Sequence, residues 1–168
     1  GMTSLDDRDL KILTILQTEG RLTKAALAER VNLSPAACWE RLQRLERAGI
    51  IIGYEARINP KLLTGAAEVL MSLELESHRS SDFQAFEKAI EAIPEVVECW
   101  AVGGGIDYML RVVTQDIAAY QALVDGMLST GIGVKRYYSY VVTKSIKRTA
   151  VPLDLLDMSE PKNRRSPA

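Results

Sequence analysis

The sequence contains few of the residues that build disulfides or metal sites. It has two cysteines, Cys38 and Cys99, which lie far apart among apolar neighbours, and one histidine, His78. The usual soft metal ligands are too few to assemble a site, so we expect no metal and no cofactor. The two thiols are expected to be small buried residues in a reducing compartment.

Long hydrophobic runs are also missing. No apolar stretch reaches the roughly 20 residues that cross a bilayer. Residues 3–9 are polar and acidic, where a signal peptide would be apolar. We therefore expect a cytoplasmic protein without a membrane partner.

The chain has no excess of positive charge. The formal net charge of its 168 residues is -1. Residues 1–58 hold nine Lys or Arg and eight Asp or Glu, a net charge of +1. A strongly basic surface, the usual sign of nucleic-acid binding, is thus absent, and any contact with DNA must depend on geometry and local charge.

The first third of the chain contains the pattern of three helices. Asp6 can cap a first helix that Gly20 ends, Thr23 can cap a second, and Ser34 can cap a third that Gly49 ends. Apolar residues recur at helical spacing in each segment. A short second helix, a tight turn and a longer third helix suit a helix-turn-helix.

The third helix has an apolar face and a polar face. At about 100° per residue, Cys38, Leu42 and Leu45 align as the core face. Small residues near the start of the helix permit close approach to base edges, and arginines can reach guanine edges or phosphates. The predicted DNA-binding residues are Lys24, Ser34, Pro35, Ala36, Ala37, Glu40, Arg41, Gln43, Arg44 and Arg47. On the residues alone, a solvated amphipathic helix of any small bundle stays open as the alternative.

Residues 23–49 also carry a characteristic set of small, apolar and polar positions. They are Thr23, Ala26, Leu27, Ala28, Val31, Asn32, Leu33, Ser34, Arg41, Leu42, Leu45 and Gly49. This set resembles, without a gap, the helix-turn-helix signature of the leucine-responsive regulatory protein/AsnC (feast/famine) family of transcriptional regulators. The resemblance extends over about residues 5–147. It implies double-stranded DNA as a partner.

Beyond the third helix the pattern changes to strands. Residues 50–58 are rich in β-branched side chains and predict a strand that Asn59 and Pro60 end. In the resembled family this segment is a hinge that pairs with its partner in a dimer. Further strands are expected at 68–76, 96–102, 108–113 and 134–145, and helices at 81–93 and 116–128. The order β-α-β-β-α-β predicts two helices on one antiparallel sheet.

The expected fold class is therefore α+β. An N-terminal winged-type three-helix helix-turn-helix domain with its hinge strand is expected over residues 5–66. A ferredoxin-like βαββαβ effector-binding and oligomerisation domain follows over 67–147, and a C-terminal tail over 148–168. One face of the sheet lacks helices, and a second copy is its simplest cover. We expect a homodimer that assembles into higher even-numbered oligomers.

Residues 103–105 are three consecutive glycines, and Asp107 follows them. A zwitterionic amino acid needs an anion near its ammonium, which Asp107 can supply, and N–H donors near its carboxylate, which the glycine backbone can supply. The residues alone favour a plain hairpin turn, whereas the resemblance implies an effector cleft here. The effector-binding residues that it implies are Val102, Gly103, Gly104, Gly105, Asp107, Tyr108 and Tyr140. Gly105 stands where the family commonly has an acidic residue, which leaves the ligand open.

The leading hypothesis is a sequence-specific DNA-binding transcriptional regulator that responds to an amino acid or amino-acid-like metabolite. An effector-independent DNA-organising protein on the same scaffold is the first alternative. An interaction module would leave the helix-turn-helix spacing unexplained. An enzyme similar to haem-pathway decarboxylases is not expected, because His78 is the one histidine and no nucleophile–base pair or phosphate cradle is present.

Overall fold

The computed structural model describes residues 4–156, which divide into two compact units. The helical unit contains residues 4–57 together with 147–156, and the sheet unit contains residues 58–146. Residues 148–156, which the sequence assigns to a tail, thus group with the helical unit, and the polar end of that tail lies outside the described residues. Within residues 4–156, no helix is long and apolar enough to cross a membrane.

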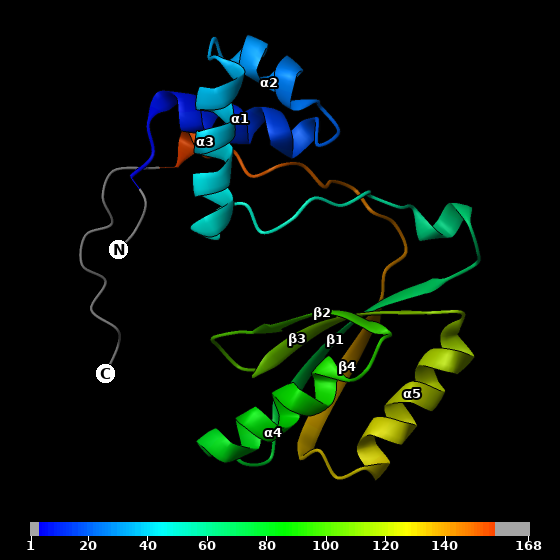
Figure 1. Ribbon diagram of the computed structural model, residues 1–168. Coiled ribbons are helices and arrows are strands. Elements are labelled where there is room, and N and C mark those ends of the chain that lie inside the picture. The colour runs from blue at the N-terminus through cyan, green and yellow to red at the C-terminus, as the bar shows by residue number, and fades with distance from the viewer. Residues whose placement is uncertain (1–3, 157–168) are drawn as a thin grey trace. The chain divides into compact units, whose positions relative to one another are not determined.

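The helical unit contains α1 (Asp7–Thr18), α2 (Lys24–Arg30) and α3 (Pro35–Arg47) (Figure 1). The side chains of Asp6, Thr23 and Ser34 each accept a backbone N–H at the start of these helices, as the sequence predicts. Asn32 turns the chain between α2 and α3 with a φ of 53°. The buried core consists of Ile12, Leu13, Ile15, Leu27, Ala28, Val31, Cys38, Leu42 and Leu45.

The strand expected at residues 50–58 is not formed, so that prediction was wrong for the single chain. These residues have no regular secondary structure, and Ile52, Tyr54 and Ile58 are exposed. A strand needs a neighbour that takes up its backbone hydrogen bonds, and the described part of the helical unit contains no strand. The 3-10 helix η1 (Pro60–Leu62) follows at the predicted break.

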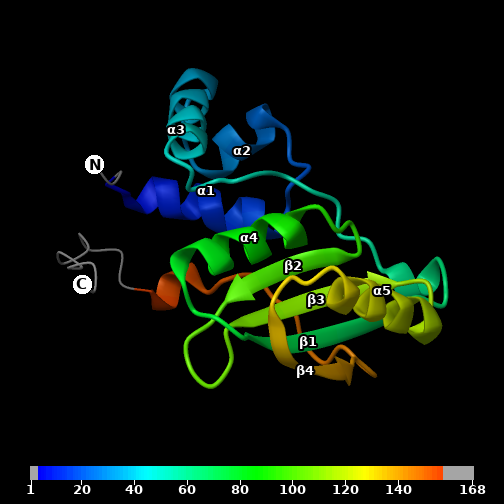
Figure 2. The same cartoon turned by 90° about the horizontal axis from the view of Figure 1, so that it is seen from below.

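The sheet unit has the predicted order of elements. They are β1 (Ala67–Leu75), α4 (Ser80–Glu91), β2 (Val96–Ala101), β3 (Tyr108–Thr114), α5 (Ile117–Ser129) and β4 (Val134–Val141). The strands are antiparallel and lie in the order β2-β3-β1-β4 (Figure 2). Both helices cover the same face of the sheet (Figure 1). This arrangement confirms the ferredoxin-like fold.

The core of the sheet unit lies between this face and the two helices. Its buried residues are Val69, Met71, Leu73, Leu75, Phe86, Ile90, Tyr108, Leu110, Val112, Tyr120, Val124 and Met127. Alternate residues of β1 and β3 supply much of this core, which agrees with the period of two in the sequence. The opposite face of the sheet receives neither α4 nor α5.

Two expectations for the sheet unit fail at its edges. Strand β4 ends at Val141 instead of residue 145, because its one neighbour, β1, begins at Ala67 and the last bond is Val142 N–H to the Glu68 carbonyl. Cys99 is exposed, whereas Cys38 is buried as expected. Cys99 lies on β2, an edge strand whose other side carries no neighbour, so solvent reaches it.

The C-terminal segment returns to the helical unit. Residues Leu153–Leu155 form the 3-10 helix η2. Leu153 packs against the helical core and lines a groove of about 240 Å³ with Leu13, Leu16 and the segment 50–54. Leu153, which follows the sheet unit, is therefore part of the packing of the helical unit.

Candidate DNA interface and ligand site

The third helix presents the surface that the sequence predicts. Its buried residues are Cys38, Leu42 and Leu45. Pro35, Ala36, Glu40, Arg44 and Arg47 are exposed, while Ala37, Arg41 and Gln43 are partly buried. The hydroxyl of Ser34 accepts the backbone N–H of Ala37 at 3.2 Å, so this residue caps α3. The predicted DNA-binding residues thus lie on α3, at its cap and at the start of α2, where Lys24 stands.

Two of the predicted arginines are bound to carboxylates of the first helix. Arg41 Nη1 lies 2.5 Å from Asp6 Oδ2 and 3.2 Å from Asp9 Oδ1. Arg44 Nη2 lies 2.8 Å from Asp9 Oδ2. The Asp9 side chain is 1% exposed, so both arginines supply the pairing that a buried carboxylate requires. Arg41 and Arg44 therefore have a structural role that the sequence did not indicate.

The ion pair with Arg41 also changes the pKa of Asp6, the exposed carboxylate of the two. The hydrogen bond from Arg41, followed by that from the Asp9 backbone N–H, lowers the pKa of Asp6 to about 2. Asp6 and Asp9 also form a reciprocal capping box at the start of α1, with N–H to carboxylate distances of 3.1 and 2.9 Å. One network thus fixes the start of α1 and orients two side chains of α3.

The remaining cations of the predicted interface have weaker partners. Arg47 Nη2 donates to Gln43 Oε1 at 3.3 Å, and both side chains lie on the face away from the core. Lys24 Nζ lies 3.5 Å from the ring centroid of Trp39, a cation–π contact between α2 and α3. Trp39 is 40% exposed and was not among the predicted site residues. Its position beside the apolar stripe of Cys38, Leu42 and Leu45 on α3 was the signal that could have identified it.

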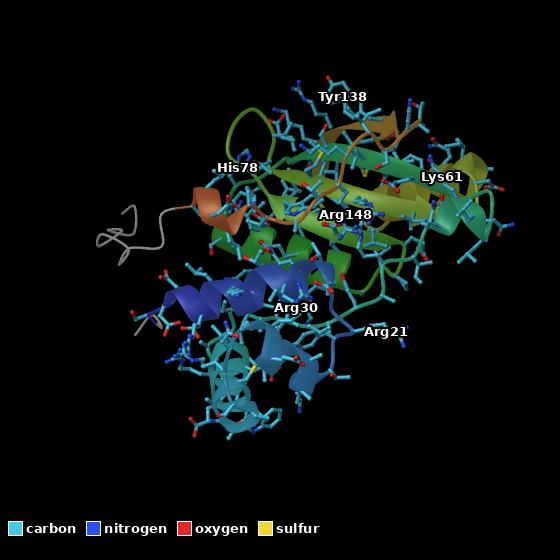
Figure 3. All side chains as sticks on the ribbon, turned by 90° about the horizontal axis from the view of Figure 1, so that it is seen from above. Arg21, Arg30, Lys61, His78, Tyr138 and Arg148 are labelled. Atoms are coloured by element: carbon cyan, nitrogen blue, oxygen red, sulfur yellow. The ribbon has the colours of Figure 1, made fainter. Side chains whose placement is uncertain are left out.

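The loop between β2 and β3 contains the predicted ligand residues. The Val102 N–H donates to the Asp107 carbonyl, and the Asp107 N–H donates to the Leu73 carbonyl, each at 3.0 Å. Asp107 Oδ2 accepts the Leu75 N–H at 2.8 Å and lies 3.0 Å from His78 Nε2. Figure 3 shows His78 beside this loop. Asp107 thus joins the loop to the end of β1, and His78 is a neighbour that the sequence did not suggest.

The three glycines leave the loop backbone open. Gly104 has a φ of +122°, a conformation that favours glycine. A Cβ at Gly103, Gly104 or Gly105 would have no neighbour within 4 Å. Among the described residues, the N–H groups of 103–106 donate to no other group. Several unused donors therefore lie in the same loop as Asp107.

The two predicted tyrosines do not meet within one chain. Tyr108 is buried against α4, where its hydroxyl donates to Glu87 Oε2 at 2.7 Å. Burial, followed by this hydrogen bond, raises the pKa of Tyr108. Tyr140 pairs with Leu70 on the other face of the sheet and is 56% exposed. Tyr108 therefore belongs to the face of the sheet that the helices cover, and Tyr140 belongs to the uncovered face.

The described residues offer little for metal chemistry. Among residues 4–156, no group of three or more His, Cys, Asp or Glu side chains is placed to hold a metal ion.

Comparison with protein families also finds two domains in the chain. Residues 5–52 match a winged helix-turn-helix DNA-binding domain. Residues 68–152 match the Lrp/AsnC ligand binding domain. The two matches correspond to the helices α1–α3 and to the ferredoxin-like sheet with the segment that follows it.

Individual relatives extend over nearly the whole chain. The transcriptional regulatory protein DoeX of Halomonas elongata is 45% identical over 155 residues, 92% of this chain and 98% of that protein. The leucine-responsive regulatory protein of Haemophilus influenzae is 38% identical over 146 residues, 87% of this chain and 88% of that protein. A crystal structure of a transcriptional regulator from Neisseria meningitidis in complex with L-Met has a TM-score of 0.81 and 36% identity. It covers 89% of this chain and 97% of that one. The chain belongs to the Lrp/AsnC family of transcriptional regulators.

Proposed function

We propose that this regulator binds double-stranded DNA sequence-specifically through α3, and that an amino acid or amino-acid-like metabolite controls this binding. The observation that carries the proposal is the pairing, in one chain, of a capped helix-turn-helix with a glycine loop whose free N–H groups stand beside Asp107. The L-Met complex of the Neisseria relative supports an amino acid as the class of ligand.

The proposed DNA contacts divide into two kinds. Arg47 and Lys24 have no carboxylate partner among the described residues, so they are free to bind phosphates or base edges. Arg41 and Arg44 share their guanidinium groups with Asp9, and only their remaining N–H donors can reach DNA. The small residues at the start of α3 permit its entry into the major groove. The proposed interface is Lys24, Ser34, Pro35, Ala36, Ala37, Glu40, Arg41, Gln43, Arg44 and Arg47.

The proposed ligand site uses complementary charges. The N–H groups of residues 103–106 bind the carboxylate of the ligand, and the free oxygen of Asp107 accepts its ammonium. Tyr108 is the first residue of β3 after the loop, and its hydrogen bond to Glu87 holds it against α4. Tyr140 joins the site only when a second copy places its sheet against the first. The proposed residues are Val102, Gly103, Gly104, Gly105, Asp107, Tyr108 and Tyr140.

We also propose a homodimer that assembles into higher even-numbered oligomers. The sheet face without helices carries Trp100, Tyr138 and Tyr140, with exposed fractions of 42, 54 and 56%, and Tyr138 lies at the β4 edge (Figure 3). Ile52, in the segment without a strand partner, is 95% exposed. A second copy buries both apolar surfaces and gives residues 50–58 a strand to pair with.

The remaining parts of the proposal concern organisation and location. The proposed domains are 5–66 for DNA binding, 67–147 for effector binding and oligomerisation, and 148–168 for the tail; in the folded chain, residues 58–66 group with the sheet unit and Leu153 packs against the helical core. The protein acts in the cytoplasm without membrane, metal or cofactor, and it is not an enzyme. The relatives described above are transcriptional regulators.

A direct experiment starts from DNA selection with the full chain and duplexes of randomised sequence. We expect enrichment of a motif with two half-sites about one helical turn, ~34 Å, apart or a multiple of it. A thermal-shift screen of the free amino acids then identifies ligands, because a ligand that binds the native state raises apparent stability. Each hit is expected to change the affinity for the selected duplex.

One observation favours the effector-independent alternative. Asp107 already accepts the Leu75 N–H and contacts His78, so a structural role satisfies one of its two oxygens. If no amino acid changes melting temperature, oligomer size or DNA affinity while a motif is selected, the DNA-organising function replaces the sensing function.

A further inference from the structure

We infer that Trp39 is a specificity-determining residue of the DNA interface, which contacts the methyl group of a thymine while Lys24 holds the adjacent phosphate. This inference rests on the proposed DNA-binding function and adds two roles to it. Trp39 enters the interface, and Lys24 acts together with the indole ring.

Packing does not explain an exposed tryptophan at this position. Trp39 lies on α3 beside Cys38, which is buried, yet 40% of Trp39 is exposed. It is not among the apolar residues that pack against the core of the helical unit. Residues three or four positions apart on a helix are neighbours, so Trp39 lies beside the exposed Pro35 and Ala36, and together they form an apolar area that a partner can cover.

The exposed surface of α3 changes in character along the helix. Near its start, the exposed residues are Pro35, Ala36 and Trp39, all apolar. Towards its end, Glu40, Arg44, Glu46 and Arg47 are exposed, all charged. The first residues of a recognition helix contact base edges. Apolar side chains in the major groove recognise the thymine methyl group, which is its one apolar feature.

Lys24 fixes one face of the indole ring. Its ammonium lies 3.5 Å from the ring centroid, so it covers that face, while 40% of Trp39 stays exposed. Among residues 4–156, the Trp39 indole N–H has no hydrogen-bond acceptor. The helix before the recognition helix crosses the phosphate backbone. Lys24, at the first position of α2, is thus held where a phosphate can bind its remaining donors.

The experiment combines a change in the protein with a change in the DNA. A motif is selected from randomised duplexes with the full chain, and each thymine in it is replaced in turn by uracil, which lacks the methyl group. We expect one replacement per half-site to lower the affinity of the wild-type protein for the duplex about fourfold, which is the effect of one buried methyl group. The same replacement is expected to leave the affinity of Trp39→Ala unchanged, whereas Trp39→Phe keeps most of the preference.

Lys24 has its own readout. Lys24→Met keeps the stem of the side chain and removes its charge. We expect the slope of log affinity against log salt concentration to decrease by about one, the value of one phosphate contact, while the preference for thymine persists. Lys88→Met, on the exposed surface of α4, is the matched control and leaves the salt dependence unchanged.

The outcomes separate the two levels of the proposal. If the wild type selects a motif but every uracil replacement changes the DNA affinity of the wild type and of Trp39→Ala by the same factor, the role of Trp39 is refuted. The proposed regulator function is then unaffected. If the wild type selects no motif, sequence-specific binding fails, and this inference fails with it.

Fluorescence provides an independent measurement that does not depend on how Trp39→Ala folds. Trp39 and Trp100 are the two tryptophans, so Trp100→Phe leaves Trp39 as the single indole emitter. We expect the selected duplex to shift this emission and to shield it from acrylamide. Unchanged emission and quenching at saturating DNA would contradict the contact.

Discussion

Arg44 on the third helix binds Asp9 on the first, with 2.8 Å between Nη2 and Oδ2. Asp9 is 35 residues away in sequence, and its side chain is 1% exposed while that of Arg44 is 49% exposed. The guanidinium therefore has one side on a buried carboxylate and the other towards solvent. Arg44 is thus part of the fold and also part of the proposed DNA-binding surface.

Replacing Arg44 is expected to affect stability and DNA binding together. Arg44→Ala leaves Asp9 with Arg41 as its one arginine partner, so we expect unfolding to become easier by about 1–3 kcal/mol. Affinity for the selected duplex is expected to fall as well, by about 1–3 kcal/mol if Arg44 binds a base with two hydrogen bonds. Thermal denaturation and fluorescence anisotropy measure the two effects separately.

Arg47→Ala is the matched comparison. Its guanidinium contacts Gln43 at 3.3 Å and no carboxylate among the described residues. We expect the melting temperature to stay close to that of the wild type while DNA affinity falls. A variant that melts earlier but binds DNA normally would remove Arg47 from the interface.

Acid is expected to weaken the helical unit through Asp6. Its pKa is lowered to about 2 from the ordinary value of 3.8, mainly by Arg41. A carboxyl with a lowered folded pKa stabilises the protein above its unfolded pKa and loses this contribution as pH falls through the folded value. The melting temperatures of wild type and Asp6→Asn should thus differ above pH 4 and converge towards pH 2. The difference is expected to be modest, because the Asp6 side chain is 54% exposed.

The ligand proposal is tested at Asp107. Asp107→Asn keeps the shape and the acceptor for the Leu75 N–H but removes the charge that binds an ammonium. We expect affinity for an amino acid found in the thermal-shift screen to fall by about one to two decades. Calorimetric titration measures this loss, and unliganded DNA binding should change little. A stable variant with unchanged ligand affinity would refute the sensing role.

His78→Ala distinguishes sensing from structure at the same site. It removes the 3.0 Å contact to Asp107 Oδ2 while leaving the carboxylate charge in place. If Asp107 binds the ligand, this variant is expected to keep ligand affinity within a few fold, because the charge that attracts the ammonium persists. If Asp107→Asn and His78→Ala both melt at a lower temperature and form smaller oligomers, with or without ligand, Asp107 has a structural role instead.

Assembly is tested on the uncovered face of the sheet. Tyr138→Glu places a charge on the surface that a second copy is proposed to cover, so we expect the oligomer to dissociate. Gln84→Glu, on the exposed side of α4, is the control with the same added charge. Light scattering gives the masses, and a wild type that stays at the monomer mass of 18.6 kDa at micromolar concentration contradicts the dimer.

The helices and most strands followed from local features of the sequence. Asp6, Thr23 and Ser34 cap the helices that they were expected to cap, because an N-cap needs one side chain and the backbone N–H three residues later. The alternation of apolar residues placed β1 and β3, because every second side chain of a strand enters the core.

Tertiary structure decided which side chains meet. The Arg44–Asp9 and His78–Asp107 pairs join residues 35 and 29 positions apart, and no periodicity connects them. The strand expected at residues 50–58 also depends on tertiary structure. It is absent because its backbone hydrogen bonds require a partner strand that the described chain does not supply. Caps and hydrophobic periods act over a few residues, and the sequence therefore determined the elements. Ion pairs, edge strands and exposed faces depend on how those elements pack, and only the folded chain determined them.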